Sequence, residues 1–280
     1  MKKTAPINKI IPFSNVDGPS NRTAVFFQGC QFNCRFCHNP ETIHMCRNCG
    51  ECIETCPVKA LTLQDGKVVW DKERCVNCDT CIRTCRYSSS PKITVMDTDA
   101  LVKEIERVQP YIQGITLSGG ECTIRKDFII ELLPEVKKMG LTCLLDSNGS
   151  LDFEENPEIL EYCDGVMLDV KAVNKAFSDW LIGYPNEVIL KNLEYLLSIN
   201  KLYEVRTIIF PGRDDDNRDT VSYVAKIIQD RCDYKIIRYR QFGVREEGRA
   251  DLGDETTDKD YAMCYVELAK SLGASRAYLV

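Results

Sequence analysis

The spacing of the cysteines constrains this chain more than any other feature of the sequence. The 280 residues include 16 cysteines, and most of them lie between Cys30 and Cys85. The first residues lack the sustained apolar core of a secretory signal, and no apolar run approaches the roughly 18 residues of a membrane span. We therefore expect a cytoplasmic protein, because thiols in a reducing compartment bind metals more often than they form disulfides. A disulfide-rich secreted scaffold is the alternative.

Charge and composition exclude some other classes of protein. The chain carries 36 Lys and Arg against 42 Asp and Glu, a net charge of −6. This balance argues against a nucleic-acid binder, because such proteins carry a basic excess. Hydrophobic residues make up 44% of the chain, an ordinary fraction for a globular protein. We expect a folded monomer that binds neither nucleic acid nor membranes.

Eight of the clustered cysteines form an internal repeat with the spacing C-x2-C-x2-C-x3-C in each half. This spacing is typical of bacterial ferredoxins, in which the fourth cysteine of one half binds the cluster of the other half. We therefore predict two [4Fe-4S] clusters, one held by Cys46, Cys49, Cys52 and Cys85, the other by Cys75, Cys78, Cys81 and Cys56. Pro57 follows the first half as the pattern expects, whereas Arg86 takes that place in the second. Zinc is the alternative metal, since paired C-x2-C motifs also suit tetrahedral zinc.

The first three cysteines form a group without a fourth member. Cys30, Cys34 and Cys37 have the spacing C-x3-C-x2-C and follow a predicted strand at residues 23–28. A cubane held by three cysteines has one iron without a protein ligand, and an open metal position is where a substrate or cofactor binds. The alternative is a degraded structural site, which the neighbouring Phe36 and the preceding strand argue against.

Strand-like and helix-like segments alternate after the repeat. The predicted strands span residues 23–28, 115–118, 141–146, 165–170, 203–210 and 234–239. The predicted helices span residues 127–139, 187–199, 218–229 and 258–272. This alternation predicts an α/β fold with parallel strands and outer helices, and about six units suffice for a partial barrel. We expect the acidic runs at residues 214–216 and 251–260 to be solvated loops.

Polar residues follow the ends of these strands, where barrel enzymes bind their substrates. Gly119 and Gly120 allow close backbone approach and Glu121 adds a carboxylate, although a turn before a helix would have the same pattern. Asp169 and Lys171 share one face of a strand, where charges are costly unless they are paired or functional. A buried ion pair is the alternative for these two residues.

These motifs together resemble the radical S-adenosylmethionine (SAM) superfamily. Its motif C-x3-C-x-aromatic-C is matched by the group from Cys30 to Cys37, with Phe36 as the aromatic residue. A three-cysteine motif followed by a two-cluster insert is similar to the glycyl radical enzyme activating enzymes, most of all the YjjW-type activases. Other similar segments are Val16-Asp17-Gly18-Pro19, Arg22-Thr23 and Cys37-His38-Asn39-Pro40. The resemblance extends over almost the whole chain.

The resemblance implies a fold and an activity. The fold would be a partial (βα)6 TIM-like radical SAM barrel formed by residues 1–41 and 92–280, with a ferredoxin-like insert at residues 42–91. The cofactors would be three [4Fe-4S] clusters and S-adenosyl-L-methionine. Reductive cleavage of SAM would give a 5′-deoxyadenosyl radical that abstracts hydrogen from a backbone glycine of a partner, a glycyl radical enzyme. A flavodoxin- or ferredoxin-like protein would supply the electron.

The resemblance also implies site residues. Cys30, Cys34 and Cys37 would hold the SAM-cleaving cluster. The residues that contact SAM would be Phe36, Cys37, His38, Gly119, Gly120, Glu121, Asp146, Ser147, Asp169, Val170, Lys171, Arg206 and Arg240. A monovalent cation would be held by Asp146, Ser147, Met167 and Asp169. Arg240 departs from the histidine that is common at this place in related activases, and arginine does not titrate near neutral pH.

Two other functions stay open on the sequence alone. One is a radical SAM enzyme that acts on a small molecule, and the other is an iron–sulfur electron carrier without chemistry of its own. The three-cysteine group argues against the carrier, which gains nothing from an open iron. Among the cysteines outside the three groups, Cys143 and Cys163 suit the apolar core, and Cys122 lies near the predicted cofactor without an assigned role.

Overall fold

A curved sheet of nine strands forms the centre of the molecule. A computed structural model describes residues 2–280. The strand order is β11-β10-β9-β8-β7-β6-β2-β1-β5. These strands are β1 (Thr4–Ser14), β2 (Arg22–Phe27), β5 (Thr94–Asp97), β6 (Gly114–Gly119), β7 (Thr142–Ser147), β8 (Gly165–Asp169), β9 (Leu202–Ile209), β10 (Asp233–Arg238) and β11 (Ala277–Leu279). All neighbours from β2 to β11 pair in parallel, whereas β1 is antiparallel to β2 and β5.

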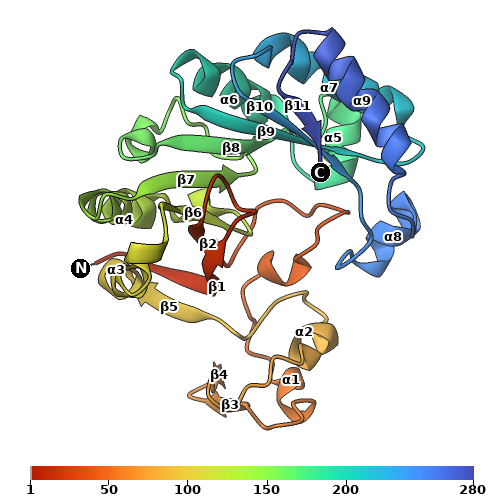
Figure 1. Ribbon diagram of the computed structural model, residues 1–280. Helices are drawn as coiled ribbons and strands as arrows, with labels where there is room; N and C mark the ends of the chain where they lie inside the picture. The colour runs from red at the N-terminus through yellow and green to blue at the C-terminus, as the bar shows by residue number, and fades with distance from the viewer. Residues whose placement is uncertain (1) are drawn as a thin grey trace.

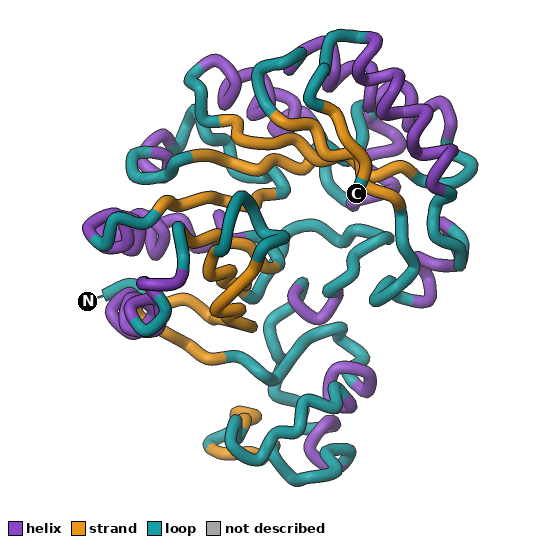
Figure 2. The backbone as a smooth tube through the Cα atoms, in the orientation of Figure 1, coloured by secondary structure: helices purple, strands orange, loops and turns teal. Residues whose placement is uncertain are grey.

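Helices cover the outer face of this sheet (Figures 1 and 2). They are α3 (Thr98–Glu106), α4 (Lys126–Lys138), α5 (Lys175–Ile182), α6 (Glu187–Ser198), α7 (Asp214–Ile228) and α9 (Lys259–Ser271), whereas α8 (Glu246–Leu252) lies apart from the sheet. In α4, Phe128, Ile129, Leu132, Leu133 and Val136 are all buried. Their spacing places them along one helical stripe, which faces the sheet and forms the core with it. None of the described helices combines the length and apolar composition that a membrane crossing requires.

The six predicted strands are present as β2 and β6 to β10, and their parallel pairing confirms the predicted α/β class. Three strands of this sheet were not predicted. Pro6 and Pro12 lie in β1, and proline argues against a strand because it does not donate to the ladder. The other two, β5 and β11, are only four and three residues long, too short to produce a periodic pattern.

Both predictions of acidic loops are wrong in part. Residues 214–216 form the first turn of α7, where carboxylates interact favourably with the helix dipole. Of residues 251–260, the first two end α8 and the last two begin α9, so only residues 253–258 lie between helices. An acidic run at a helix start and an acidic loop have the same composition, which explains the error.

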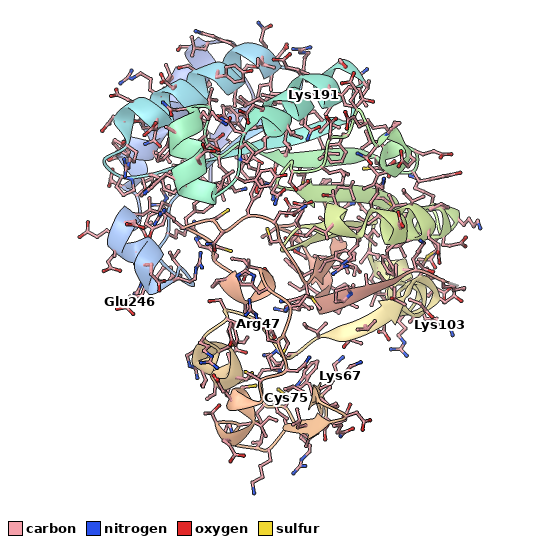
Figure 3. All side chains as sticks on the ribbon, turned by 180° about the vertical axis from the view of Figure 1, so that it is seen from behind. Arg47, Lys67, Cys75, Lys103, Lys191 and Glu246 are labelled. Atoms are coloured by element: carbon pink, nitrogen blue, oxygen red, sulfur yellow. The ribbon has the colours of Figure 1, made fainter. Side chains whose placement is uncertain are left out.

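Residues 42–91 extend away from the nine-stranded sheet (Figure 1). They contain α1 (Glu51–Glu54), α2 (Thr80–Thr84) and a hairpin of β3 (Leu61–Gln64) and β4 (Lys67–Trp70) that does not join the main sheet. Lys67 and Cys75 lie here, at the end of the molecule opposite Lys191 (Figure 3). The segment enters and leaves at adjacent points, because Ser90 N donates to Glu41 O at 3.1 Å and His44 forms a β-bridge with Ser89.

Candidate functional site

The three-cysteine loop leaves β2 at the carboxyl end of the sheet, beside the end of β6. Gly29 and Gly120 bring the two strand ends into contact, and Glu121 N donates to Gly29 O at 2.8 Å. A Cβ atom on Gly120 would lie 2.3 Å from Gly29 O, so the contact requires glycine at position 120. Cys34 is buried, and Cys30 and Cys37 are half-buried. The structure thus brings the predicted Gly119-Gly120-Glu121 turn directly against the cysteine loop.

The end of α5 supports one side of the cysteine loop. Asn33 N donates to Ile182 O and Arg35 N donates to Leu181 O, both at 2.9 Å. The Arg35 side chain adds a bond from Nε to Trp180 O at 2.7 Å, and its guanidinium lies 4.7 Å from the ring centroid of Trp180. The last carbonyls of a helix have no partners within the helix, and here the loop satisfies them.

Residues 240–252, which we call the clasp, hold the opposite side of the loop and include α8 (Figure 1). Arg245 Nη2 donates to Asn33 Oδ1 at 2.7 Å and to Cys34 O at 3.3 Å. A Cβ atom on Gly248 would lie 1.8 Å from Arg35 O. An ion pair of Arg35 with Asp251 completes the contact. Sequence reasoning missed the clasp, because contacts between distant backbones leave no local pattern.

Arg240 belongs to this clasp, but its contact with the loop is through the backbone. His38 Nε2 lies 2.9 Å from Arg240 O, whereas the Arg240 side chain is exposed. A Cβ atom on Gly243 would lie 2.3 Å from His38 O, so this part of the clasp is also in close contact with the loop. The predicted contact of the Arg240 side chain with SAM stays a prediction.

A network of charges lines the inner face at the ends of β7, β8 and β9. Arg206 Nη1 donates to Asp146 Oδ1 at 2.8 Å, and Arg206 Nη2 lies 3.1 Å from Met167 Sδ. Ser118 Oγ donates to the other oxygen of Asp146 at 2.8 Å. The register explains this gathering, because Asp146 pairs with Met167 and Met167 pairs with Glu204 across the parallel strands.

Glu204 anchors this network and was not singled out by the sequence. Its carboxylate is buried and accepts from Arg206 Nε at 2.6 Å, from Lys235 Nζ at 3.1 Å and from Tyr278 Oη at 3.2 Å. The spacing could have indicated this role, because Glu204 lies two residues before Arg206 and therefore shares its strand face.

Lys171 and Asp169 form the ion pair that was the alternative reading of these residues. Lys171 Nζ lies 2.5 Å from Asp169 Oδ2 and 6.0 Å from the ring centroid of Phe36. Burial alone would lower the pKa of Lys171, but the charge of the adjacent Asp169 carboxylate outweighs burial and raises it. Lys171 is therefore a cation that faces the cysteine loop, and the pairing does not remove it from the site. The neighbouring Val170 is fully buried.

Glu121 lies inside the protein with both carboxylate oxygens engaged. Oε1 accepts from Thr123 N and from Ser147 Oγ, each at 3.0 Å, and Oε2 accepts from Asn148 N at 2.6 Å. Burial raises the pKa of Glu121, and these donors oppose that rise. The carboxylate thus connects the end of β6 to the end of β7.

The eight repeat cysteines line two cavities in residues 42–91. Cys46, Cys49, Cys52 and Cys85 line one cavity. Cys56, Cys75, Cys78 and Cys81 line the other, and Cys81 also borders the first. In residues 2–280, no three His, Cys, Asp or Glu side chains stand close enough to share a single metal ion.

The other cysteines lie apart from these groups. Cys143 and Cys163 are buried, which confirms their prediction as core thiols, and Cys232 is buried as well. Cys122 is buried beside Glu121, and Cys264 is exposed on α9.

Comparison with known proteins agrees with this arrangement. The model of the radical SAM superfamily matches residues 24–224. The choline trimethylamine-lyase activating enzyme of Oleidesulfovibrio alaskensis is 31% identical over 270 residues, covering 87% of this chain and 86% of that protein. The pyruvate formate-lyase-activating enzyme of Streptococcus mutans is 28% identical over 254 residues, covering 86% of this chain and 80% of that protein.

Among solved structures, QueE from Escherichia coli has the same fold, with a TM-score of 0.56 at 15% identity, covering 99% of this chain and 94% of that chain. The matched family model spans most of the chain, and the activating enzymes match almost all of it. The chain therefore belongs to the radical SAM superfamily and, within it, to the glycyl-radical enzyme activating enzymes.

Proposed function

We propose that this chain activates a glycyl radical enzyme by cleaving SAM reductively and generating a radical on a backbone glycine of that partner. The observation that carries the proposal is the position of the three-cysteine loop. The loop lies at the same rim as Glu121, Lys171 and Arg206, so a metal cluster and a charged cofactor have their candidate ligands in one place. The relatives are named as activating enzymes of such partners, which supports a protein substrate over a small molecule.

The residues of the loop suit a [4Fe-4S] cluster. Cys30, Cys34 and Cys37 provide three thiol donors, and thiolates are the ligands that iron–sulfur clusters prefer. The Lys171 cation faces the loop and compensates thiolate charge. When bound, the cluster supplies one electron to the sulfonium of SAM and so generates the 5′-deoxyadenosyl radical.

The other rim residues bind and orient SAM in this proposal. The backbone at Gly119 and Gly120 approaches the cofactor closely, and Lys171 and Arg206 donate to its carboxylate. Phe36, Cys37, His38, Asp146, Ser147, Asp169, Val170 and Arg240 remain proposed contacts. Glu121 acts through the residues that it holds, since its own oxygens are engaged inside the protein.

The proposal contains no monovalent cation. Each of the four residues that the resemblance assigns to a cation already has a partner in the protein. Arg206 contacts Asp146 and Met167, Lys171 pairs with Asp169, and the Ser147 hydroxyl donates to Glu121. The guanidinium of Arg206 thus provides positive charge beside Asp146 and Met167.

Residues 42–91 would form the ferredoxin-like insert, with residues 1–41 and 92–280 as the barrel. The two cysteine-lined cavities support two further [4Fe-4S] clusters, which would pass electrons from a flavodoxin- or ferredoxin-like donor to the loop. Because thiolate ligands require reducing conditions, the proposal retains the cytoplasm as the compartment and a monomer as the working unit.

An anaerobic assay tests the proposal. The protein is reconstituted with iron and sulfide, reduced and mixed with SAM, and 5′-deoxyadenosine is quantified. We expect product from the wild type and none from Cys34→Ala, whereas Cys163→Ala, which removes a thiol outside the three groups, retains activity. No product from iron-loaded wild type that nevertheless binds SAM would contradict the proposal.

The protein substrate needs a second assay. A glycyl radical enzyme from the genome that encodes this chain is labelled with deuterium at the glycine Cα. Transfer of deuterium into 5′-deoxyadenosine, with an electron paramagnetic resonance (EPR) signal on the partner, is the expected result. SAM cleavage without transfer to any such partner would favour a small-molecule substrate.

A further inference from the structure

Asn148, directly after β7, aims its side chain at a cysteine of the loop. The residue is 7% exposed, and its Nδ2 lies 3.5 Å from Cys30 Sγ. The orientation of the amide is determined by its other end, where Asn148 Oδ1 accepts from Ser150 N at 2.9 Å. A backbone N–H donates only, so the oxygen must face Ser150 and the NH2 group must face Cys30.

Glu121 holds Asn148 in this place. Glu121 Oε2 accepts from the backbone N–H of Asn148 at 2.6 Å, and Oε1 accepts from the Ser147 hydroxyl at 3.0 Å. The Ser147 oxygen in turn accepts from Gly149 N at 3.1 Å. The start of the loop after β7 is therefore attached to a buried carboxylate at the end of β6, which leaves Asn148 little freedom to move away from Cys30.

We propose that Asn148 donates a hydrogen bond to the Cys30 thiolate and raises the reduction potential of the cluster at the three-cysteine loop. Glu121 is the positioning residue for this bond. A donor to a cluster sulfur stabilises the reduced state, which carries more negative charge, and hydrogen bonds to the sulfurs are a recognised control of cluster potential. The inference rests on the proposed function, because it takes Cys30 as a ligand of the SAM-cleaving cluster.

The test is a redox titration of the reconstituted protein that follows the EPR signal altered by added SAM. This signal separates the loop cluster from the other iron. Asn148→Ala and Asn148→Leu both remove the donor, and Leu retains the side-chain volume if Ala disturbs packing. We expect the midpoint potential of the SAM-responsive signal to shift to more negative values in both variants. Glu121→Asp, which retains the negative charge beside Cys30 but shortens the side chain that holds Asn148, is expected to shift the potential in the same direction.

The control is Asn200→Ala, an exchange at an exposed turn far from the loop in sequence. This variant is expected to retain the wild-type midpoint, and the signals that do not respond to SAM are expected to stay unchanged in every variant. Wild-type potentials in both Asn148 variants, with the SAM response intact, would overturn the inference. A different result would contradict the proposed function itself, namely a wild-type protein that shows neither a SAM-responsive signal nor SAM cleavage.

Discussion

The two cysteine-bearing regions differ in what holds their thiols in place. In the three-cysteine loop, backbone and side-chain bonds from α5 and from the clasp fix the chain around Cys34, which is buried. In residues 42–91 the buried apolar core consists of Cys52, Leu61 and Cys81, so two of its three members are themselves predicted ligands.

This difference indicates that the two regions depend on metal to different degrees. Protein contacts hold the three-cysteine loop in place, and the loop needs its cluster for chemistry. A segment of about 50 residues with so small a core does not bury enough apolar surface to fold firmly. With the two clusters of the proposed function bound there, metal binding would supply its folding free energy.

Removal of iron by an anaerobic chelator is expected to unfold residues 42–91 and leave the barrel folded. Amide hydrogen exchange should become fast throughout the hairpin β3–β4 and stay slow in β6 to β8, because only the hairpin region loses its core. Equal protection of the hairpin amides from exchange, with and without iron, would show that residues 42–91 do not depend on metal to fold.

Gly248→Ala is expected to disturb the loop while leaving residues 42–91 intact. Helix propensity alone predicts that the exchange stabilises α8 by about 1 kcal/mol, but the clash with Arg35 O predicts a cost of about 1–3 kcal/mol. A displaced loop misaligns the reacting groups, so SAM cleavage should fall about tenfold or more. Arg249→Ala, an exposed change on the same helix, serves as the control, and equal turnover in both variants would show that the clasp does not position the loop.

Cys49→Ala is expected to slow the delivery of electrons to the three-cysteine loop. The variant should bind SAM with wild-type affinity, because Cys49 lies outside the barrel, and should be reduced severalfold more slowly by a protein donor. Stopped-flow absorbance measures the reduction, and Cys264→Ala, which removes another exposed thiol, is the control. Unchanged reduction kinetics would exclude residues 42–91 from the electron path.

Replacement of potassium by tetramethylammonium is expected to have the smallest effect. Because Arg206 already contacts Asp146 and Met167, the dissociation constant for SAM should stay within about twofold, which is well below 1 kcal/mol. Isothermal titration under anaerobic conditions measures it. A tenfold weaker binding without potassium would show that a cation is required at these residues after all.

Much of the fold was predictable, because strand and helix periodicities are local properties of the sequence. The spacing of the repeat cysteines predicts two sets of four ligands, and this assignment stays a prediction. The same cysteines line two neighbouring cavities, with Cys81 at the border of both. The strand ends at Ser118, Asp146 and Asp169 were placed at one rim by the alternation alone.

The parts that escaped prediction depend on contacts between distant segments. In the clasp, Arg245 and Gly248 contact a loop about 210 residues earlier in the chain. Neither segment has a sequence pattern that indicates this contact. The hydrogen bonds from Thr123 and Asn148 to the Glu121 carboxylate could not be predicted either. A Gly-Gly-Glu turn has the same sequence whether its carboxylate faces a ligand or the protein interior.

The adjacent entry and exit of residues 42–91 have an evolutionary consequence. Because Glu41 and Ser90 are hydrogen-bonded neighbours, the chain between them can be lengthened, exchanged or deleted without moving β2 or β5. This segment can therefore be exchanged as a unit during evolution. If residues 42–91 receive the electrons, as we propose, the route of electron supply can change from one descendant to the next while the rim residues of the sheet are inherited unchanged.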